Sequence, residues 1–341
     1  MAQESTQAVA VAEAAATARQ KSIFDHPTTR FLLKRFRQLI ISVFILITAT
    51  FLMLQLIPGD PVRNALGPTA PPEIVEAQRA LMGLDKPLLQ QYVDFIFGIF
   101  RGDLGVSLSS KVPVTDIIAT RLPATLQIVV PAYILTFAAG IPIGVFMARF
   151  TRNSRRPKSE VAFTTSSVVV QTTPDFILTV AFIALFSITL GWLPAAGRSG
   201  PDSYIIPILA LAIGPIFFIA RLIRLDMLRV LGLDYIRAAR SKRIGVARTY
   251  FRHALPNALT ATLTVAGLAL GSLLAGSVLV ETVLSWPGLG TEMVSGITLK
   301  NYPVVQGVIL VYGAMILALN LIVDLIIMII DPRVTFDGGA A

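Results

Sequence analysis

Six long runs of apolar residues, separated by polar segments, dominate the chain. The run 39–57 has 19 residues without a charge, which at about 1.5 Å of helix rise per residue matches a roughly 30 Å hydrocarbon core. Because hydrocarbon offers backbone groups no hydrogen-bond partner, runs of this length are expected to be helices. The pattern predicts an all-α polytopic membrane protein with six transmembrane helices. The other five runs are 123–148, 161–190, 204–220, 259–280 and 304–330.

Lysine and arginine residues are distributed unevenly among the segments between these runs. Of the 29 basic residues, 21 lie before the first run, between the second and third, between the fourth and fifth, or after the sixth. Positive charge is retained on the cytoplasmic side of a membrane, so these segments and both termini are expected to be cytoplasmic. The predicted organisation is a disordered cytosolic tail (1–29), a first transmembrane helix (30–57), an external loop (58–122), a five-helix core (123–335) and a C-terminal tail (336–341).

The composition agrees with a membrane protein and excludes several soluble classes. Hydrophobic residues make up 54% of the chain and charged residues only 14%, whereas an average soluble domain has about 25% charged residues. The absence of cysteine excludes a disulfide framework and a cysteine-ligated metal site. The net charge of +9 is explained by the cytoplasmic loops, so nucleic-acid binding is not expected.

The chain carries no recognisable catalytic motif. No lysine follows a glycine, so the Gly-Lys that holds nucleotide phosphates at the end of a P-loop is missing. The sequence has two histidines, and the acids within the predicted spans lie on different helices. We therefore expect no catalytic residue, no bound metal and no cofactor in this chain.

The cytoplasmic segment 222–256 is strongly basic. Residues 234–245 are compatible with a helix in which Ala238, Ala239 and Ser241 lie beside basic side chains. Such a helix could present its small and basic residues to a cytosolic partner. Equally, the segment could be a loop that rests on anionic lipid head groups, which attract Lys and Arg. Residue chemistry alone leaves both interpretations open.

The same segment resembles the "EAA" loop of ABC-importer permeases, whose pattern is Glu-Ala-Ala, three residues, Gly, nine residues and Ile-x-Leu-Pro. Ala238-Ala239 and Leu255-Pro256 stand at the matching spacing, with Arg237 in the Glu place. The chain is similar to the first-permease subunit of the dipeptide/oligopeptide/nickel branch over residues 30–335. Other motifs of that branch include Pro58-Gly59-Asp60-Pro61, Arg101-Gly102-Asp103-Leu104-Gly105 and Trp286-Pro287-Gly288-Leu289-Gly290.

In this family the EAA segment is the coupling helix that docks into a cytosolic ATPase. Arg243 stands where that branch usually has Gly, and we expect Gly245 to provide the bend instead. The coupling residues that the resemblance implies are Asp234, Tyr235, Arg237, Ala238, Ala239, Arg240, Lys242, Arg243, Gly245, Leu255 and Pro256.

The resemblance also implies a set of partners. These are a second homologous permease that completes the pore, two ATPase subunits that bind ATP and Mg, an external substrate-binding protein, and the lipid of a bacterial cytoplasmic membrane. Peptides are the leading cargo, and relatives in the branch also carry nickel chelates, glutathione, opines, haem or sugars. The external loop 58–122 either docks the binding protein and gates the outer face of the pore, or only packs against the partner permease.

Four polar residues are candidates for the translocation path: Gln171, Thr172, Asp175 and Glu281. Asp175 lies near the middle of the third run, where an acid costs ~2.5–3.5 kcal/mol and usually faces a bundle interior or an aqueous cavity. It could line the pore and favour cationic or amine-bearing cargo, or it could pair with a neighbouring polar side chain. Glu281 could line the outer gate, although contact with head-group water is the simpler reading. Asp324 is expected to make a polar contact between helices.

Two other classes of protein are weaker alternatives. A secondary transporter or channel subunit, which would not be driven by ATP, is expected to show inverted repeats with broken helices in matching positions. No such self-similarity relates residues 36–190 to residues 204–330. A membrane enzyme would need a polar catalytic cluster, which the sequence lacks.

Overall fold

The computed structural model describes residues 27–56, 60–67, 69–152 and 156–330. Within these residues the chain is helical, and its only strand-like pairing is an isolated bridge between Val106 and Pro113. The predicted all-α fold is confirmed. The predicted tails 1–29 and 336–341 lie outside the described residues, except that 27–29 belong to the first helix.

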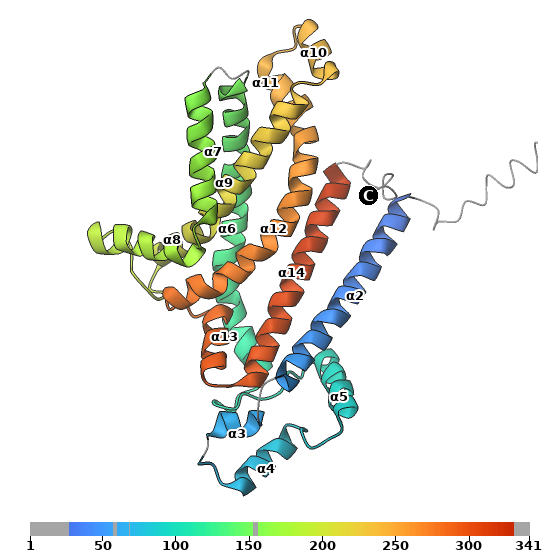
Figure 1. The fold of residues 1–341 in the computed structure, drawn as a ribbon, viewed down its shortest axis with the longest axis vertical. Helices are drawn as coiled ribbons and strands as arrows, with labels where there is room; N and C mark the ends of the chain where they lie inside the picture. Colours follow the sequence, from blue (N-terminus) through green and yellow to red (C-terminus); the bar gives the residue numbers. More distant parts are fainter. Residues whose placement is uncertain (1–26, 57–59, 68, 153–155, 331–341) are drawn as a thin grey trace, which may run out of the picture.

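Each of the six predicted runs corresponds to a helix or a helix pair (Figure 1). The central helices are α6 (Val114–Phe150), α9 (Ile205–Val230) and α12 (Leu255–Val283), while α2 (Pro27–Gln55) packs on α14 (Tyr302–Ile330) beside them. Among the described residues, four helices are long and apolar enough to cross a membrane, and a bent pair would make a fifth. Six crossings and cytoplasmic termini therefore stay predictions.

The third run is broken in the structure, and the predicted continuous helix is wrong. Helix α7 (Pro157–Thr172) ends before Pro174, and the chain turns by 98° into α8 (Asp175–Phe182). Proline has no N–H to donate and disfavours helical backbone at the residue before it. Thr173 accordingly has the extended angles φ −76° and ψ 121°. Asp175 is thus the first residue of a new helix, not the centre of an old one.

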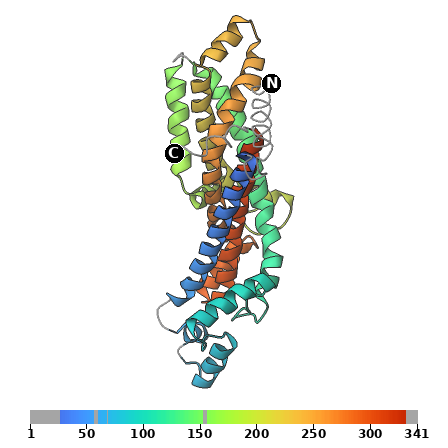
Figure 2. The same cartoon turned by 90° about the vertical axis from the view of Figure 1, so that its right-hand side faces the viewer.

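Short helices gather at the two ends of the molecule. Figures 1 and 2 both place α3–α5 at one end and α10 at the opposite end. Helix α6 already begins at Val114, within the predicted external loop 58–122. The shorter elements are α3 (Pro61–Leu66), α4 (Pro72–Leu81), α5 (Leu88–Arg101), η3 (Ile183–Thr189), η4 (Pro201–Tyr204), α10 (Asp234–Ser241), α11 (Val246–Arg248), η5 (Thr249–Ala254) and α13 (Leu289–Thr298).

The segment that contains α3–α5 is packed onto the rest of the chain. The Tyr92 ring lies 5.2 Å from that of Phe51 on α2. Asn301, just before α14, donates from Nδ2 to the Ser107 hydroxyl at 2.8 Å. Asp60 caps α3 by accepting from the Val62 amide at 3.0 Å and is paired with Arg79. Burial alone would raise the pKa of Asp60, but these two partners outweigh it and hold the pKa below its ordinary value.

Helix α9 is longer than predicted, because residues 222–230 continue it instead of opening the cytoplasmic segment. Ile223, Met227 and Val230 recur at helical spacing and are buried. Arg224 is also buried and forms an ion pair with Glu160 of α7 at 2.6 Å. Buried apolar residues at helical spacing, together with the neutralisation of Arg224 by Glu160, therefore allow α9 to continue beyond the uncharged run 204–220.

Glycines bring α6 and α9 into close contact. A Cβ added at Gly144 would lie 2.6 Å from the Ala220 carbonyl oxygen, and one at Gly140 would lie 3.0 Å from the Ile219 Cβ. Small residues at such positions let helix backbones approach in a membrane, where packing replaces the hydrophobic driving force. Ile219 of this contact also lines the polar cavity described below.

Candidate functional site

Helix α10 is anchored to the C-terminal end of α9 and the N-terminal end of α12. Ile236 is 0% exposed and packs in a cluster with Met227, Leu231 and Tyr250. The Tyr235 hydroxyl accepts a hydrogen bond from Asn257 Nδ2 at 3.0 Å. One apolar and one polar contact therefore hold a short helix that would be unstable alone.

The opposite face of α10 is exposed and polar. Asp234, Arg237, Ala238 and Lys242 are exposed, while Ala239 is half-buried. Asp234 and Arg237 form an ion pair at 3.1 Å in full solvent, which contributes little to stability. The side chain of Arg240 lies outside the described residues. Leu255 is half-buried and Pro256 exposed in the first turn of α12.

The turn after α10 is formed by Arg243, and the prediction that Gly245 takes over the bend is wrong. Arg243 has a φ of 55°, whereas Gly245 has an ordinary φ of −56°. The Ile244 amide donates to the Ala239 carbonyl at 3.2 Å, which is the bond of a Schellman C-cap with its left-handed residue at 243. The left-handed turn therefore stays at position 243, although this chain has Arg there in place of the Gly that favours it.

A cavity of about 300 Å³ lies where the chain turns from α7 into α8, against α6, α9 and α12. Three of the four predicted path residues line it, and Glu281 does not. Its polar lining side chains are Thr136, Gln171, Thr172, Thr173, Asp175 and Ser272.

Asp175 differs from the other polar residues of the cavity. Its carboxylate has no hydrogen-bond or ion-pair partner among the described residues, whereas Thr172 donates to the Val168 carbonyl of its own helix at 2.9 Å. A Cβ added at Gly276 of α12 would overlap the Asp175 carboxylate. The glycine therefore leaves the space that the carboxylate occupies. Gln171 accepts from Arg221 Nη2 of α9 at 3.1 Å.

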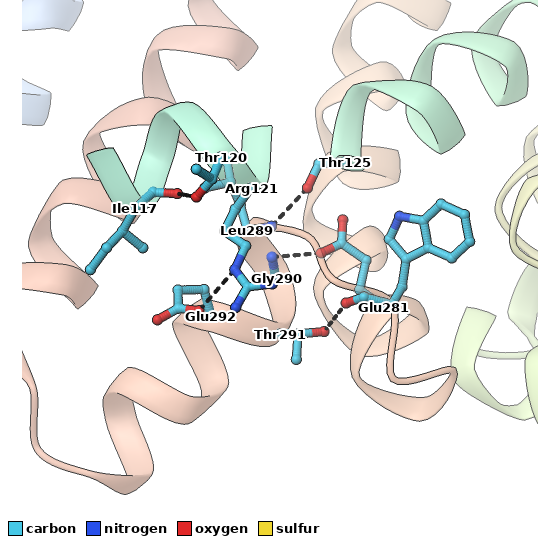
Figure 3. Close-up of polar contacts among 10 residues, drawn as sticks. Ile117, Thr120, Arg121, Thr125, Glu281, Leu289, Gly290, Thr291 and Glu292 are labelled. Atoms are coloured by element: carbon cyan, nitrogen blue, oxygen red, sulfur yellow. Dashed lines mark hydrogen bonds and ion pairs between the residues drawn. The ribbon is translucent and has the colours of Figure 1, made fainter. Parts of the chain in front are cut away.

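Glu281 is enclosed at the other end of α12 and does not reach head-group water, while its place at an outer gate stays a prediction. Its side chain is 0% exposed, and its Oε2 accepts from the Gly290 amide at 2.7 Å. Beside it, the Thr125 hydroxyl of α6 accepts from the Leu289 amide at 2.8 Å, as Figure 3 shows. Glu281 thus joins the start of α13 to α12.

Further contacts close the region around Glu281. Arg121 of α6 pairs with Glu292 of α13 at 3.3 Å (Figure 3). Trp286 is 0% exposed, donates from Nε1 to the Ala124 carbonyl at 2.9 Å, and meets the Tyr204 ring edge-on at 4.9 Å. These contacts tie α13 to α6 and to the start of α9.

Several of these contact residues carried no signal in the sequence. Arg221 directly follows the predicted fourth span and was counted among the cytoplasmic basic residues. Thr125 is an isolated hydroxyl within an apolar run. Asp324 does make the expected contact between helices, with Arg35 of α2 at 2.9 Å, although its partner was not anticipated.

Comparisons with known proteins agree on the family. The model of the binding-protein-dependent transport system inner membrane component matches residues 140–336, and the model of its N-terminal part matches residues 28–129. Together they cover most of the chain, including α10, α13 and every residue that lines the cavity except Thr136.

Named relatives match over nearly their whole length. A putative peptide transport system permease protein of Brucella abortus is 38% identical over 317 residues, which cover 91% of this chain and 100% of that protein. The glutathione transport system permease protein GsiC of Escherichia coli K12 is 34% identical over 306 residues, covering 90% and 99%.

The fold is also shared with a solved transporter. The MetNI methionine ABC transporter in an inward facing conformation aligns with a TM-score of 0.51 at 20% identity, covering 63% of this chain and 96% of the matched chain. The chain therefore belongs to the family of binding-protein-dependent transport system inner membrane components, as a multi-pass, non-enzymatic permease subunit of an ABC importer.

Proposed function

We propose that this chain pairs with a second, homologous permease to form the translocation path for a peptide-class solute in a bacterial cytoplasmic membrane. An external binding protein delivers the solute, and two cytosolic ATPases drive its passage. The named relatives, which belong to peptide and glutathione transport systems, support this class of cargo. The family supports an assembly of several subunits.

The ATPase docks on α10 and the first turn of α12. The observation that carries this assignment is the division of α10 into two faces. Ile236 is buried against the ends of α9 and α12, while Ala238 and the charged residues of the segment are exposed. A helix that is fixed on one side can transmit a push on its other side to α9 and α12, which both line the cavity.

The cavity forms part of the path, and Asp175 favours cargo that carries an amine. An unpaired carboxylate in a membrane interior is costly, and a cationic group in the cavity would offset that cost. Gln171 and Thr172 supply further polar surface. Glu281 is not part of the path, because its carboxylate is enclosed and bonded to Gly290.

The docking assignment is tested by placing a carboxylate on the exposed face of α10. The variant Ala238→Asp is expected to reduce both ATPase co-purification and alanyl-alanine uptake roughly tenfold or more, since an unpaired charge would be buried at the contact. The matched control is Ala77→Asp, another exposed alanine, on α4 at the opposite end of the molecule. It should retain the ATPases.

Two outcomes would contradict the proposal. Normal ATPase retention and uptake by Ala238→Asp would place the ATPase elsewhere. Uptake by the wild-type protein that continues without ATP or without any ATPase subunit would instead indicate a secondary transporter or channel.

A further inference from the structure

Asp175 lines the cavity and Arg221 is bonded to Gln171 of its lining, and neither of these charged side chains has a counter-ion among the described residues. Asp175 makes no ion pair or hydrogen bond through its carboxylate there. Arg221 donates to the neutral amide of Gln171 and forms no ion pair in the described part of the chain. The nearby Arg224 differs, because Glu160 neutralises it at 2.6 Å.

Arg221 belongs to the cavity face of α9. Gly214 and Phe218 both line the cavity, and Arg221 follows them by seven and three residues, which places it on the same side of the helix. The arginine therefore continues the cavity wall by one turn. Gln171, which lines the cavity itself, holds the guanidinium at 3.1 Å.

The carboxylate is held at the wall of the cavity by the shape of the neighbouring helices. The turn at Pro174 makes Asp175 the first residue of α8. Gly276 leaves the space for its Oδ2, and a Cβ at Gly214 would lie 4.0 Å from its Oδ1. The acid is thus fixed between α9 and α12, while the basic group lies on the side of the cavity where α7 meets α9.

We propose that this cavity binds a small zwitterion, with its ammonium group at Asp175 and its carboxylate at Gln171 and Arg221. The inference rests on the proposed transport function and narrows its cargo to solutes with a free amino group and a free carboxylate, such as short peptides. A volume of about 300 Å³ is at the lower end of small-molecule sites. Asp175 and Arg221 are both only partly exposed, and attraction between charges is stronger in such surroundings than in bulk water.

A purely structural role for both residues makes a different prediction. Negative charge stabilises a helix N-terminus, so Asp175 would support α8, and Arg221 would only join α9 to α7 through Gln171. Under that reading, substitution of either residue changes binding of all solutes alike. The two readings are separated by measuring discrimination between solutes.

The test uses the assembled transporter complex in lipid nanodiscs without its binding protein, so that only the membrane site selects. Binding of alanyl-alanine, its N-acetyl derivative and its C-terminal amide is measured by equilibrium dialysis. Wild type is expected to prefer the free dipeptide over both blocked forms by roughly tenfold or more, as for a desolvated charge pair. Asp175→Asn should lose the preference over the acetylated form alone, and Arg221→Gln the preference over the amide alone.

Matched variants complete the design. Arg221→Lys keeps the charge and should retain discrimination against the amide. Arg229→Gln removes an exposed arginine further along α9 and should leave all three affinities unchanged. Size-exclusion chromatography confirms that each variant assembles.

Equal loss for all three probes, or a wild type that binds no dipeptide or does not discriminate, would overturn the inference. Failure of the proposed peptide transport is detected separately, as absence of alanyl-alanine uptake by the complete transporter with its binding protein. Uptake without discrimination at the cavity would leave the transport function in place and remove only the zwitterion site.

Discussion

The two carboxylates at Asp175 and Glu281 have opposite surroundings, although sequence reasoning grouped them as candidates for one path. Glu281 is 0% exposed and accepts a backbone hydrogen bond from Gly290 at 2.7 Å. Asp175 lines a cavity and has no partner of its own among the described residues. Position within a transmembrane helix therefore does not decide what a membrane-buried acid does.

The role of such an acid depends on which groups its carboxylate contacts. A carboxylate bonded to the backbone of a neighbouring segment fixes that segment, since an unpaired buried amide costs about 1–3 kcal/mol. A carboxylate that faces a cavity without a partner is available to a solute. Changes around Glu281 should consequently reduce stability, whereas changes around Asp175 should alter transport.

The largest expected effect lies in the region of Glu281, at Trp286. Replacing this fully buried side chain by Ala removes its packing and its hydrogen bond to Ala124, and should cost about 3–5 kcal/mol. The other tryptophan of the chain, Trp192, is 68% exposed, so Trp192→Ala is the matched control with an expected loss below about 1 kcal/mol. Thermal unfolding of the purified complex measures both. Equal losses would refute the structural assignment of this region.

A second pair of variants compares the glycines beside the two acids. A Cβ at Gly290 would lie 2.6 Å from the Val278 Cα, so Gly290→Ala must move the backbone of α13 and should cost about 1–3 kcal/mol. At Gly276 the three atoms nearest to the added Cβ all belong to the Asp175 side chain. Gly276→Ala should displace that carboxylate and weaken solute binding, with little change in the unfolding temperature. If Gly276→Ala lowered the unfolding temperature and Gly290→Ala weakened only solute binding, Asp175 would be the structural acid and Glu281 the one that contacts the solute.

The all-α fold could be predicted because the length of an apolar run is read directly from the order of residues along the chain. The sequence did not predict the break at Pro174, although the proline is visible. Pro123, Pro131 and Pro142 all lie inside the unbroken helix α6, so proline by itself does not end a membrane helix. Whether it bends the chain depends on the packing of neighbouring helices, which local sequence does not contain.

The candidate site was predicted in part for a similar reason. Gln171 and Asp175 are four residues apart, so their placement in one cavity follows from local spacing and a turn. Arg221 was assigned to the cytoplasm because it directly follows the predicted span 204–220, and only the longer α9 brings it to Gln171. The environment of Glu281 depends on how α13 folds back onto α12. This fold places Gly290, nine residues after Glu281, against its carboxylate.

Replacing each acid by its amide isolates the effect of charge. Glu281→Gln keeps an oxygen that can accept from the Gly290 amide, so uptake of alanyl-alanine should stay near the wild-type rate. Asp175→Asn keeps the size but loses the charge in the cavity, and uptake should fall roughly tenfold, which corresponds to about 1.4 kcal/mol. Uptake into cells that express each variant with the native partners measures the difference. Equal uptake by the two variants would show that charge at Asp175 has no part in transport.

Asp324 is an intermediate case, because it has a partner that is itself charged. It pairs with Arg35 between α14 and α2 at 2.9 Å, and both side chains stay partly exposed. Partly exposed ion pairs contribute about 0–1 kcal/mol, so Asp324→Asn should lower stability by no more than this and leave the preference for free dipeptide unchanged. A double-mutant cycle with Arg35→Gln measures the coupling directly. A change in solute preference would mean that a neutralised acid also acts on cargo, and that the absence of a partner is not what distinguishes Asp175.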